Sequence, residues 1–460
     1  MSPTLYGSQN RVTQRGIYLE LTTDRASREE LADWISAFDA AVPQWLQFWG
    51  MPANAADGWL VRGLVVEDVA AFRATGDIPD AVPTFPYGYA AKGRLWVRVQ
   101  DTSHYTRHLV LHEGVHALAI ELFGGTGPTW YMEATAELLA THRDRVITAS
   151  SDPISPANAL LAQRDDFRIN RIPRSKREAP LWGRFKVIDE HRNSGALPRL
   201  DSVLNLPVDL KGAVEEYTWC WVAAMMMTHY PDTRDVFLRA ARNGYDRSPA
   251  FTSRLYRELQ PQWPVVRARW RVALQELDYG YDWSRHGLTV STDDSRYSGQ
   301  AMSLSVAADQ GWQSAGVWFP ARSQVRIVAE GKCRVMTASS AVDTDIPSDG
   351  QGTSNPVDWM SGPAGVTGRF HRGNPLGQLR VWLLPIAPED GRFLRPADIR
   401  PVVPLRSSAA GMTELETGLV VRVDQPSWLL FRVNDGCGEL GTFQLADNEG
   451  FLRVEVSSVQ

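Results

Sequence analysis

The pattern of apolar and polar positions changes once along the chain. Before residue 280, short stretches that alternate apolar and polar residues are interspersed with longer segments in which apolar residues recur every three or four positions. These two periods are typical of strands and of amphipathic helices. Beyond Gly287 the helical period stops, and alternation continues in segments at 301–306, 324–329, 379–384, 418–423, 428–433 and 451–456. The pattern predicts an α+β domain over residues 1–285 and an all-β sandwich over residues 288–460.

Local signals predict the order of the first elements. Residues 16–21 and 59–66 have the alternation of strands, and residues 67–75 favour a short helix. Ser27 and Glu30 form a capping-box sequence that opens a helix, which Pro43 is expected to end or kink. Lys92-Gly93 predicts a hairpin between residues 87–91 and 94–99. Later helices are predicted at 214–230, 232–243, 248–259 and 262–277.

An apolar run at residues 109–117 contains His112, Glu113 and His116. Two histidines four positions apart project from one face of a helix, where both rings can reach one zinc ion at about 2.0–2.1 Å. Polar residues at 101–103 can cap this helix, and a glycine pair at 124–125 can end it. Three ionisable groups in a buried helix are costly unless something compensates them, as a metal ion would. The motif predicts a zinc site, with Glu113 placed to take a proton from water activated by the ion.

A catalytic zinc site needs a third protein ligand. Gly-Pro-Thr at 127–129 signals the start of a second helix after a short glycine-rich loop, so the two helices are expected to be antiparallel neighbours. Glu133 is then placed to face His112 and His116 as the third ligand. Glu137 lies one turn later, either as a partner that orients a ligand histidine or as the ligand itself. A salt bridge without metal is the alternative for both glutamates.

These two segments resemble those of a known family. H-E-G-V-H at 112–116, followed by W-Y-M-E-A-T-A at 130–136, is similar to the motifs of the gluzincin metallopeptidases of the peptidase MA type. Their second motif commonly runs W-x-x-E-G-x-A, so Ala134 stands where glycine is usual. The resemblance implies a zincin-like fold, zinc ligands His112, His116 and Glu133, and Glu113 as the general base for peptide-bond hydrolysis.

The resemblance also implies two features of the cleft. In gluzincins the last strand before the zinc-binding helix borders the cleft and pairs with an extended substrate; residues 95–99 are the candidate here, with an ordinary internal strand as the alternative. Gluzincins often place a tyrosine or histidine from a later helix near the zinc, to donate a hydrogen bond to the oxyanion. Tyr217 is the candidate, with His229 and Tyr230 as rivals. A packed core position is the alternative for Tyr217.

Composition limits the classes of partner. The 460 residues carry a formal net charge of −5, and 43% are hydrophobic and 22% charged. These values are typical of a soluble globular protein and give no reason to expect nucleic acid or an anionic membrane as a partner. No apolar run approaches the length of a membrane-spanning segment. The first residues lack the charged and apolar regions of a signal peptide, so none is expected in this chain, and the compartment stays open.

Two further features bear on the chemistry. Cys220, Cys333 and Cys437 are far apart and odd in number, which predicts thiols rather than a disulfide framework or a metal site. A basic stretch interrupted by prolines contains Arg164, Arg168, Arg171, Arg174, Lys176, Arg177 and Arg184. This stretch predicts a solvated face or loop, or else a positive rim of the cleft that favours acidic substrates.

The end of the chain resembles a second family. L-F-R-V-N-D at 430–435 and L-A-D-N-E-G-F at 445–451 are similar to the final strands of the LecA-like, calcium-dependent galactose-binding lectins. The resemblance implies a β-sandwich in which the oxygen ligands of Asp435, Asp447 and Asn448 hold calcium. The loop at 436–446 is longer than is usual in that family, and no His-x-x-Gln sugar-contacting pair is found. Asx-turns are the alternative role for the three residues.

Together these features predict zinc-dependent hydrolysis of peptide bonds in proteins or peptides, with an appended lectin-like binding module for which carbohydrate is a candidate ligand. Glycoprotein substrates would suit both halves of the chain. The alternative is a carbohydrate- or surface-binding protein whose zinc site is structural or inactive.

Overall fold

The computed structural model describes residues 11–143, 167–207, 210, 214–335, 359–404, 417–438 and 444–459. These residues form mixed α+β structure, which confirms the predicted class, and the chain divides into two compact units. The first unit comprises residues 1–187 and 200–259, and the second comprises residues 188–199 and 260–460. The second unit therefore begins earlier than the predicted boundary near residue 285 and also includes a short segment from the middle of the chain.

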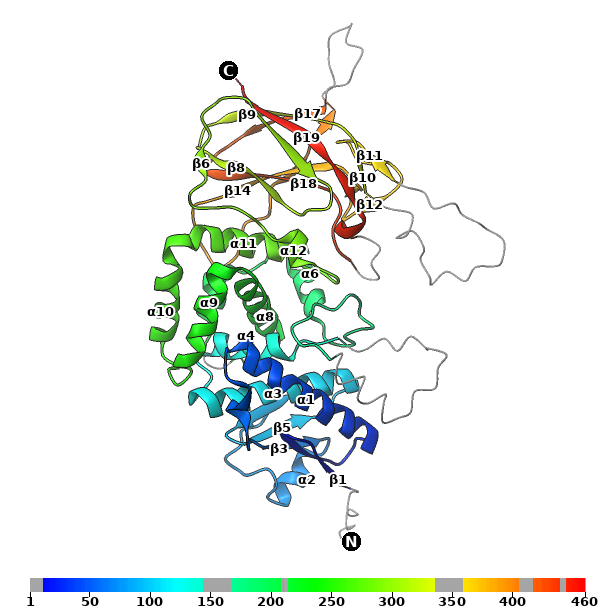
Figure 1. Cartoon of the computed structure of the whole chain (residues 1–460), viewed down its shortest axis with the longest axis vertical. Helices are drawn as coiled ribbons and strands as arrows, with labels where there is room; N and C mark the ends of the chain where they lie inside the picture. Colours follow the sequence, from blue (N-terminus) through cyan, green and yellow to red (C-terminus); the bar gives the residue numbers. More distant parts are fainter. Residues whose placement is uncertain are drawn as a thin grey trace, which may run out of the picture. The chain divides into compact units, whose positions relative to one another are not determined.

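A mixed five-stranded sheet forms one layer of the first unit (Figure 1). Its spatial order is β1-β2-β3-β5-β4. β2, β3 and β5 run parallel, and β1 and β4 add an antiparallel strand at each edge. The predicted turn at Lys92-Gly93 joins β4 to β5. The bounds are β1 Val12–Arg15, β2 Leu19–Thr23, β3 Val61–Val66, β4 Gly88–Ala91 and β5 Arg94–Arg98.

Different helices cover the two faces of this sheet. α1 (Arg28–Phe48) and α3 (Ser103–Phe123) lie on one face, and α2 (Val69–Ala74) lies on the other (Figure 1). Phe72 of α2 packs into an apolar cluster with Val66 and Trp96 of the sheet. Both faces of the sheet are therefore covered. α3, which carries the predicted zinc-binding motif, lies on the same face as α1.

α1 begins at the predicted capping box. Ser27 Oγ accepts a hydrogen bond from Glu30 N at 3.1 Å, and Glu30 Oε2 accepts one from Ser27 N at 3.0 Å. The helix does not end at Pro43 but continues to Phe48. Proline inside a helix costs about 3 kcal/mol, but burial of a large apolar side chain stabilises by about 1.5–3 kcal/mol. Trp45 and Leu46, both buried beyond Pro43, therefore offset the loss.

Helices complete the first unit. α4 (Thr129–Ala140) packs against both α3 and α8 (Val214–His229), and α9 (Pro231–Ala240) packs against α8 and α10 (Pro249–Leu259). Shorter elements are η1 (Ala53–Ala56), α7 (Leu200–Val203) and η2 (Ala241–Asn243), and α6 (Arg184–Ser194) begins in this unit and ends in the second.

The prediction that residues 95–99 form the open edge beside the cleft is wrong. β5, which contains most of these residues, lies between β3 and β4. The hairpin at Lys92-Gly93 folds β4 onto the outer side of β5, so β4 is the edge strand. Alternation along a strand shows which residues are buried, but it does not show which strand of a hairpin lies outermost.

Two sheets face each other in the second unit. One has the order β11-β10-β19-β9-β17-β16, with β7 also paired to β19, and the other has the order β15-β14-β18-β8-β6. A common apolar core includes Val325 and Val454 from the first sheet and Val381, Phe431 and Phe319 from the second. This is the predicted sandwich, and each of the six predicted strands is present. The bounds are β6 Ser295–Arg296, β7 Met302–Ala307, β8 Gln313–Phe319, β9 Gln324–Glu330, β10 Cys333–Arg334, β11 Met360–Ser361, β12 Phe370–His371, β13 Asn374–Pro375, β14 Leu379–Pro385, β15 Ile399–Pro401, β16 Val403–Pro404, β17 Thr417–Arg422, β18 Ser427–Val433 and β19 Glu449–Ser458.

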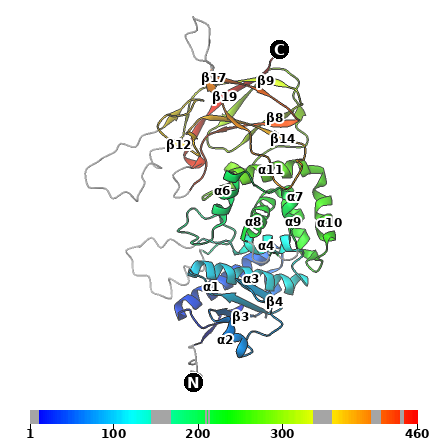
Figure 2. The same ribbon diagram turned by 180° about the vertical axis from the view of Figure 1, so that it is seen from behind.

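α11 (Trp263–Glu276) adds a third layer to the second unit. It lies along the sheet that contains β14 and β8 (Figure 2). Val265, Ala268 and Val272 of α11 pack in one cluster with Trp382 and Trp428 of the sheet. Alternate residues of β14 and β18 therefore enter the sandwich core or the layer under α11, so both faces of these strands are buried. Shorter elements here are η3 (Gln260–Gln262), α12 (Trp283–His286) and η5 (Leu445–Asp447).

Candidate metal centre

The predicted zinc-binding motif lies on a helix with well-defined ends. Thr102 Oγ1 accepts a hydrogen bond from Tyr105 N at 3.2 Å at the start of α3, and Gly124, with φ +71°, ends the helix. At Gly114, inside the motif, a Cβ atom would come within 2.2 Å of a ring carbon of Phe38. Glycine at this position lets α1 pack closely on α3. The face of α3 that carries the two histidines points toward α4.

His112 and His116 of α3 meet Glu133 of α4. His112 Nε2 lies 3.1 Å from Glu133 Oε2 and 3.1 Å from His116 Nε2, and His116 Nε2 lies 3.6 Å from Glu133 Oε2. All three side chains are buried. The structure thus brings together the three residues that the sequence predicts as zinc ligands; we call them the triad.

The triad has the spacing of a tetrahedral metal site. Zinc bonds of about 2.0–2.2 Å to nitrogen and oxygen place neighbouring ligand atoms about 3.3–3.6 Å apart in a tetrahedron. The observed separations of 3.1 Å, 3.1 Å and 3.6 Å lie close to this edge length. Two imidazoles and one carboxylate also match a known catalytic donor set that keeps a fourth position open. The residues present therefore fit a divalent ion with the preferences of zinc.

The charges of the triad are coupled. Burial disfavours the charged form of His112, but the carboxylates of Glu133 and Glu137 raise its pKa to about 10. Burial also disfavours ionised Glu133, but its hydrogen bonds with His112 and His116 lower its pKa to about 2. Glu133 is therefore ionised at neutral pH and attracts a cation. Without a metal ion, the protonated His112 ring supplies this positive charge. A metal ion would displace the proton.

Glu137 faces the other nitrogen of the His112 ring. Its Oε1 lies 3.3 Å from His112 Nδ1, and its Oε2 lies 2.9 Å from Arg184 Nη2. Burial opposes ionisation of Glu137, but Arg184 and His108 hold its pKa well below the ordinary range. Of the two predicted roles, this position is that of a residue that orients His112, because Glu137 faces His112 Nδ1 and not the Nε2 atom that meets Glu133 and His116.

His108 is a neighbour of the centre that the motif did not predict. Its Nε2 lies 3.5 Å from Glu137 Oε2, and its Nδ1 lies 3.2 Å from the carbonyl oxygen of Ala140. A sequence signal for it exists, because histidines recur every four positions along one face of α3, at His104, His108, His112 and His116. H-E-x-x-H uses only the last two of these.

The basic stretch is mostly exposed. Arg168, Arg171, Arg174, Lys176 and Arg177 are all exposed, which agrees with a solvated face, and Arg164 lies outside the described residues. Arg184 is the exception, because it is buried against Glu137. It therefore serves the centre as a fixed partner of a carboxylate, and its charge is paired with that of Glu137.

Glu113 approaches the edge strand of the sheet. A Cβ atom at Gly88 of β4 would come within 2.4 Å of Glu113 Oε1, so glycine makes room for this carboxylate. Glu113 is buried, and burial raises its pKa. A raised pKa suits a carboxyl group that must accept and release a proton near neutral pH.

A pocket opens beside Glu113 and His112. It encloses about 500 Å³, part of it open to solvent, and its walls include Tyr87, Tyr105 and Tyr217. The ring centroids of Tyr217 and His112 are 6.2 Å apart. Burial, with the charges of Glu133 and Glu113, raises the pKa of Tyr217, so its hydroxyl group keeps its proton. The rivals of Tyr217, His229 and Tyr230, are not among the lining residues.

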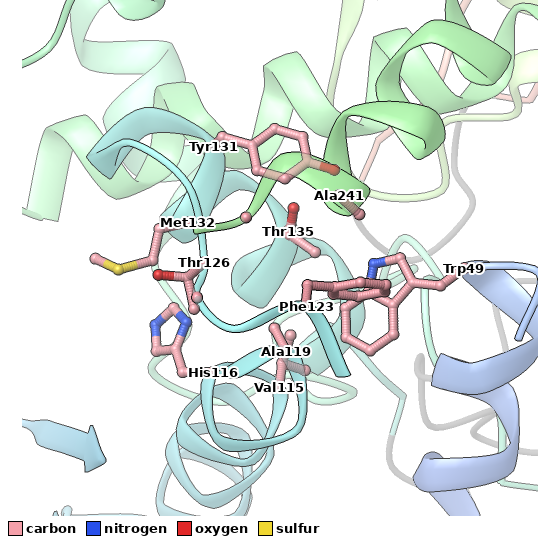
Figure 3. Close-up of a pocket in the computed structure, with 12 residues that line it drawn as sticks. Trp49, Val115, His116, Ala119, Phe123, Thr126, Tyr131, Met132, Thr135 and Ala241 are labelled. Atoms are coloured by element: carbon pink, nitrogen blue, oxygen red, sulfur yellow. The ribbon is translucent and has the colours of Figure 1, made fainter. Parts of the chain in front are cut away.

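A smaller pocket adjoins His116 but not Glu113 (Figure 3). It encloses about 270 Å³, and its walls include Trp49, Phe123 and Met132. In Figure 3 the His116 ring lies beside Thr126 and Met132. These walls are largely apolar and contain no second acid or base, so the chemistry of the centre faces the larger pocket.

Two of the predicted calcium ligands interact directly in the second unit. Asp435 forms a side-chain hydrogen bond with Asn448 and is affected by the charge of Asp447, and its Oδ1 accepts a hydrogen bond from Gly436 N at 2.7 Å. Burial raises the pKa of Asp435 to about 7, although hydrogen bonds with Asn448 and Gly436 oppose this shift. The Oδ1 atom of Asn448 is buried without a hydrogen-bond partner. The side chains thus offer clustered oxygen atoms of the kind that calcium prefers.

Comparisons with known proteins place the chain in no family. No protein-family model matches it, and no curated protein matches it. Among solved structures, one match is "EclA N-terminal domain; PllA-like lectin", at 19% sequence identity and a TM-score of 0.19, covering 34% of this chain and 95% of that chain. At this TM-score the likeness supports no conclusion about fold or function.

Two remaining predictions concern the chain as a whole. Cys220, Cys333 and Cys437 are buried free thiols, as their spacing predicts. Within the described ranges, no helix is long and apolar enough to cross a membrane.

Proposed function

We propose that this protein is a zinc-dependent peptidase of the gluzincin type, with a zincin-like first unit. The proposal rests on the meeting of His112, His116 and Glu133 at separations of 3.1–3.6 Å. Glu113 lines the adjoining pocket, as a general base must. The H-E-x-x-H sequence of α3 and the W-x-x-E sequence of α4 support the same assignment.

The side chains divide the work of hydrolysis. The triad would hold the zinc ion, which would act as a Lewis acid and lower the pKa of water to about 7. Glu113 takes a proton from the attacking water and passes it to the leaving amine. Tyr217 keeps its hydroxyl proton and donates a hydrogen bond to the developing oxyanion. Glu137, held by Arg184, keeps the His112 ring in position.

β4 is the strand with which an extended substrate would pair. It lies at the edge of the sheet, and its residue Gly88 borders Glu113. Addition of a peptide strand to a free edge is a general mode of recognition, in which side-chain pockets supply specificity. Tyr87, Tyr105 and Leu109 give the adjoining pocket aromatic and apolar walls, so we expect it to accept a large apolar side chain.

Replacing Glu113 by glutamine tests the proposal. Glutamine keeps the size of the side chain but cannot take the proton, so Glu113→Gln should keep its zinc and lose about 10²–10⁴-fold in turnover of a denatured protein substrate. In the same assay Tyr217→Phe should lower kcat by about 10²–10³-fold with little change in KM. Elemental analysis and thermal unfolding of each variant verify that zinc and fold are retained.

Unchanged turnover in Glu113→Gln would contradict the proposed mechanism. A wild-type protein that binds zinc but cleaves no peptide bond would favour the alternative, a carbohydrate- or surface-binding protein with a structural zinc site.

For the second unit, the clustering of Asp435, Asp447 and Asn448 favours a calcium-dependent binding module, and glycoproteins are then the substrate class that suits both units. Calcium that binds only the folded state raises its stability by mass action. Calcium should therefore raise the unfolding temperature of wild-type protein but not that of Asp435→Asn. An equal rise in the unfolding temperature of both proteins would contradict a calcium site that includes Asp435.

A further inference from the structure

A pocket in the second unit contains none of the residues assigned above to a metal. It encloses about 610 Å³, part of it open to solvent. Sites for small molecules typically have volumes of about 300–1,000 Å³. Its walls come from α6, α11 and the segment that follows β14, and they include Arg192, Arg271 and Arg395. None of the described residues that line it is acidic. A cleft lined by charges of one sign attracts ligands of the opposite sign.

Two of these arginines have anionic partners. Arg192 pairs with Asp189 and also donates hydrogen bonds to two backbone carbonyl oxygens at the end of α11. Arg271 pairs with Glu389. Each pair has a net charge near zero, so these two arginines alone do not make the pocket positive.

Arg395 differs from the other two arginines. It is exposed, and its guanidinium group has no ion-pair partner among the residues that the structure describes. Burial lowers the pKa of Arg271, the carboxylate of Glu389 opposes this shift, and the charge of Arg395 adds to it. The guanidinium groups of Arg395 and Arg271 therefore lie near each other, and the charge of Arg395 is the one left unbalanced at the pocket.

The pair of Arg271 and Glu389 holds the backbone of Arg395. Arg271 Nη2 donates a hydrogen bond to Arg395 O at 3.0 Å, and Glu389 Oε2 accepts one from Arg395 N at 2.7 Å. The side chains of the pair are only 10% and 9% exposed. Desolvation offsets much of the attraction within a buried ion pair, so such a pair is weak evidence for stability but can fix one arrangement of the chain. The arrangement fixed here places Arg395 at the pocket.

The remaining walls offer contacts to more than a bare ion. Leu197 and Leu394 add apolar surface, and Leu394 N donates a hydrogen bond to Leu197 O at 2.8 Å, which holds their two segments together. The side chain of Gln275 forms no hydrogen bond within the described part of the chain. Its amide group can therefore donate to and accept from the hydroxyl groups of a ligand.

We propose that this pocket binds a small organic anion with hydroxyl groups, of the class of sugar acids and sugar phosphates, and that Arg395 holds its oxyanion. The planar fork of an arginine matches the oxygens of a carboxylate or a phosphate and can form two parallel hydrogen bonds with either. The inference does not depend on the proposed peptidase activity, because every lining residue belongs to the second unit.

Calorimetric titration of the full chain tests the inference. The probes are glucuronate, glucose 6-phosphate, neutral glucose and inorganic phosphate, all at one ionic strength. Wild-type protein should bind glucuronate or glucose 6-phosphate at one site per chain, and the tighter of the two identifies the oxyanion as carboxylate or phosphate. Glucose and inorganic phosphate should each bind at least about 10-fold more weakly, because each lacks part of the hydrogen-bonding groups of the ligand.

Arg395→Gln should raise the Kd of the bound sugar anion by about 10–100-fold, the effect of losing a charge-assisted hydrogen bond. The fold should be retained, because the contacts of Arg395 with Arg271 and Glu389 use its backbone atoms, and thermal unfolding verifies this. Arg395→Lys keeps the charge without the fork, so its Kd should lie between the two. The matched control is Arg392→Gln, at an exposed arginine that does not line the pocket, which should bind as wild type does.

Each of four results would overturn the inference. The first is that wild-type protein binds neither sugar anion, and the second is an equal Kd in wild type and Arg395→Gln. The third is glucose that binds as tightly as the sugar anions, which removes the role of the oxyanion. The fourth is inorganic phosphate that binds as tightly as the sugar anions, which removes the role of the apolar wall and Gln275. Failure of the zinc site changes none of these outcomes.

Discussion

Buried glutamates pair with arginines in both units. In the first unit Arg184 holds Glu137, and in the second unit Glu276, the last residue of α11, pairs with Arg432 and Arg372. Trp312 Nε1 also donates a hydrogen bond to Glu276 Oε1 at 2.8 Å. Removing one partner of such a pair leaves the other charge buried and unpaired, which is strongly destabilising. Substitutions at these single residues should therefore have large effects.

Glu276→Gln should destabilise the second unit at neutral pH and reduce its sensitivity to acid. Burial opposes ionisation of Glu276, but Arg432 and Arg372 hold its pKa well below the ordinary value of 4.5. A lowered pKa contributes stability that is fully present above the ordinary pKa and is lost as the pH falls below it, because unfolding then takes up a proton. Near neutral pH the variant should lose about 3–5 kcal/mol in the free energy of unfolding.

Denaturant unfolding of wild type and variant, near neutral pH and at about pH 3.5, below the usual carboxyl pKa, measures both effects. The difference in the free energy of unfolding between the two proteins should shrink at the lower pH. A difference that is equal at both pH values would show that ionised Glu276 does not contribute to stability.

At the same scale, sequence motifs identify only part of the centre. His112, Glu113, His116 and Glu133 could be predicted because their spacing on two neighbouring helices encodes their proximity. Arg184 could not, because its position depends on how a separate segment crosses α3, where Thr102 Oγ1 donates a hydrogen bond to the carbonyl oxygen of Pro180 at 3.4 Å. Proximity created by tertiary contacts leaves no periodic signal in the sequence.

At the scale of secondary-structure elements, β4 and α3 define the cleft together. Among the residues that the structure describes, β4 pairs only with β5, so its other side has backbone groups available to an extended peptide. α3 packs against β4 and carries Glu113. β4 and α3 approach each other closely at Gly88, where any side chain would meet the Glu113 carboxylate.

Gly88→Ala should impair catalysis more than stability. The new Cβ atom would lie 2.4 Å from Glu113 Oε1 and would force the carboxylate away from its position. A small misplacement of a catalytic group can cost about 10²-fold in turnover. Peptide hydrolysis, zinc content and the unfolding temperature of the variant should be measured together. Wild-type turnover in a folded Gly88→Ala protein would mean that β4 does not constrain Glu113.

The element order was largely predictable, but the partners of each element were not. Caps and periodicity located the first residues of α1, α3, α4 and α8, since these signals are local. The outer position of β4 and the passage of α1 through Pro43 depend on packing. Burial of Trp45 and Leu46 outweighs the local cost of the proline, and no local pattern records that balance.

At the scale of the whole molecule, the chain folds as two compact units whose boundary differs from the change in periodicity. α11 has the helical period of the first half of the chain, yet it belongs to the second unit. Its apolar face covers Trp382 and Trp428, while alternate residues of the same strands fill the sandwich core. Every residue of β18 is buried, and the apolar run at 428–431 is the sequence signal of a strand buried on both faces.

Metal content of the purified protein tests the central claim most directly. Wild-type protein and Glu133→Ala are saturated with zinc, freed of excess and analysed by elemental mass spectrometry, with Glu29→Ala as a control at an exposed glutamate. The triad predicts that Glu133→Ala holds one zinc fewer per chain than wild type and loses peptide hydrolysis, whereas Glu29→Ala matches wild type. Equal zinc in wild type and Glu133→Ala, or none in either, would contradict a zinc site formed by His112, His116 and Glu133.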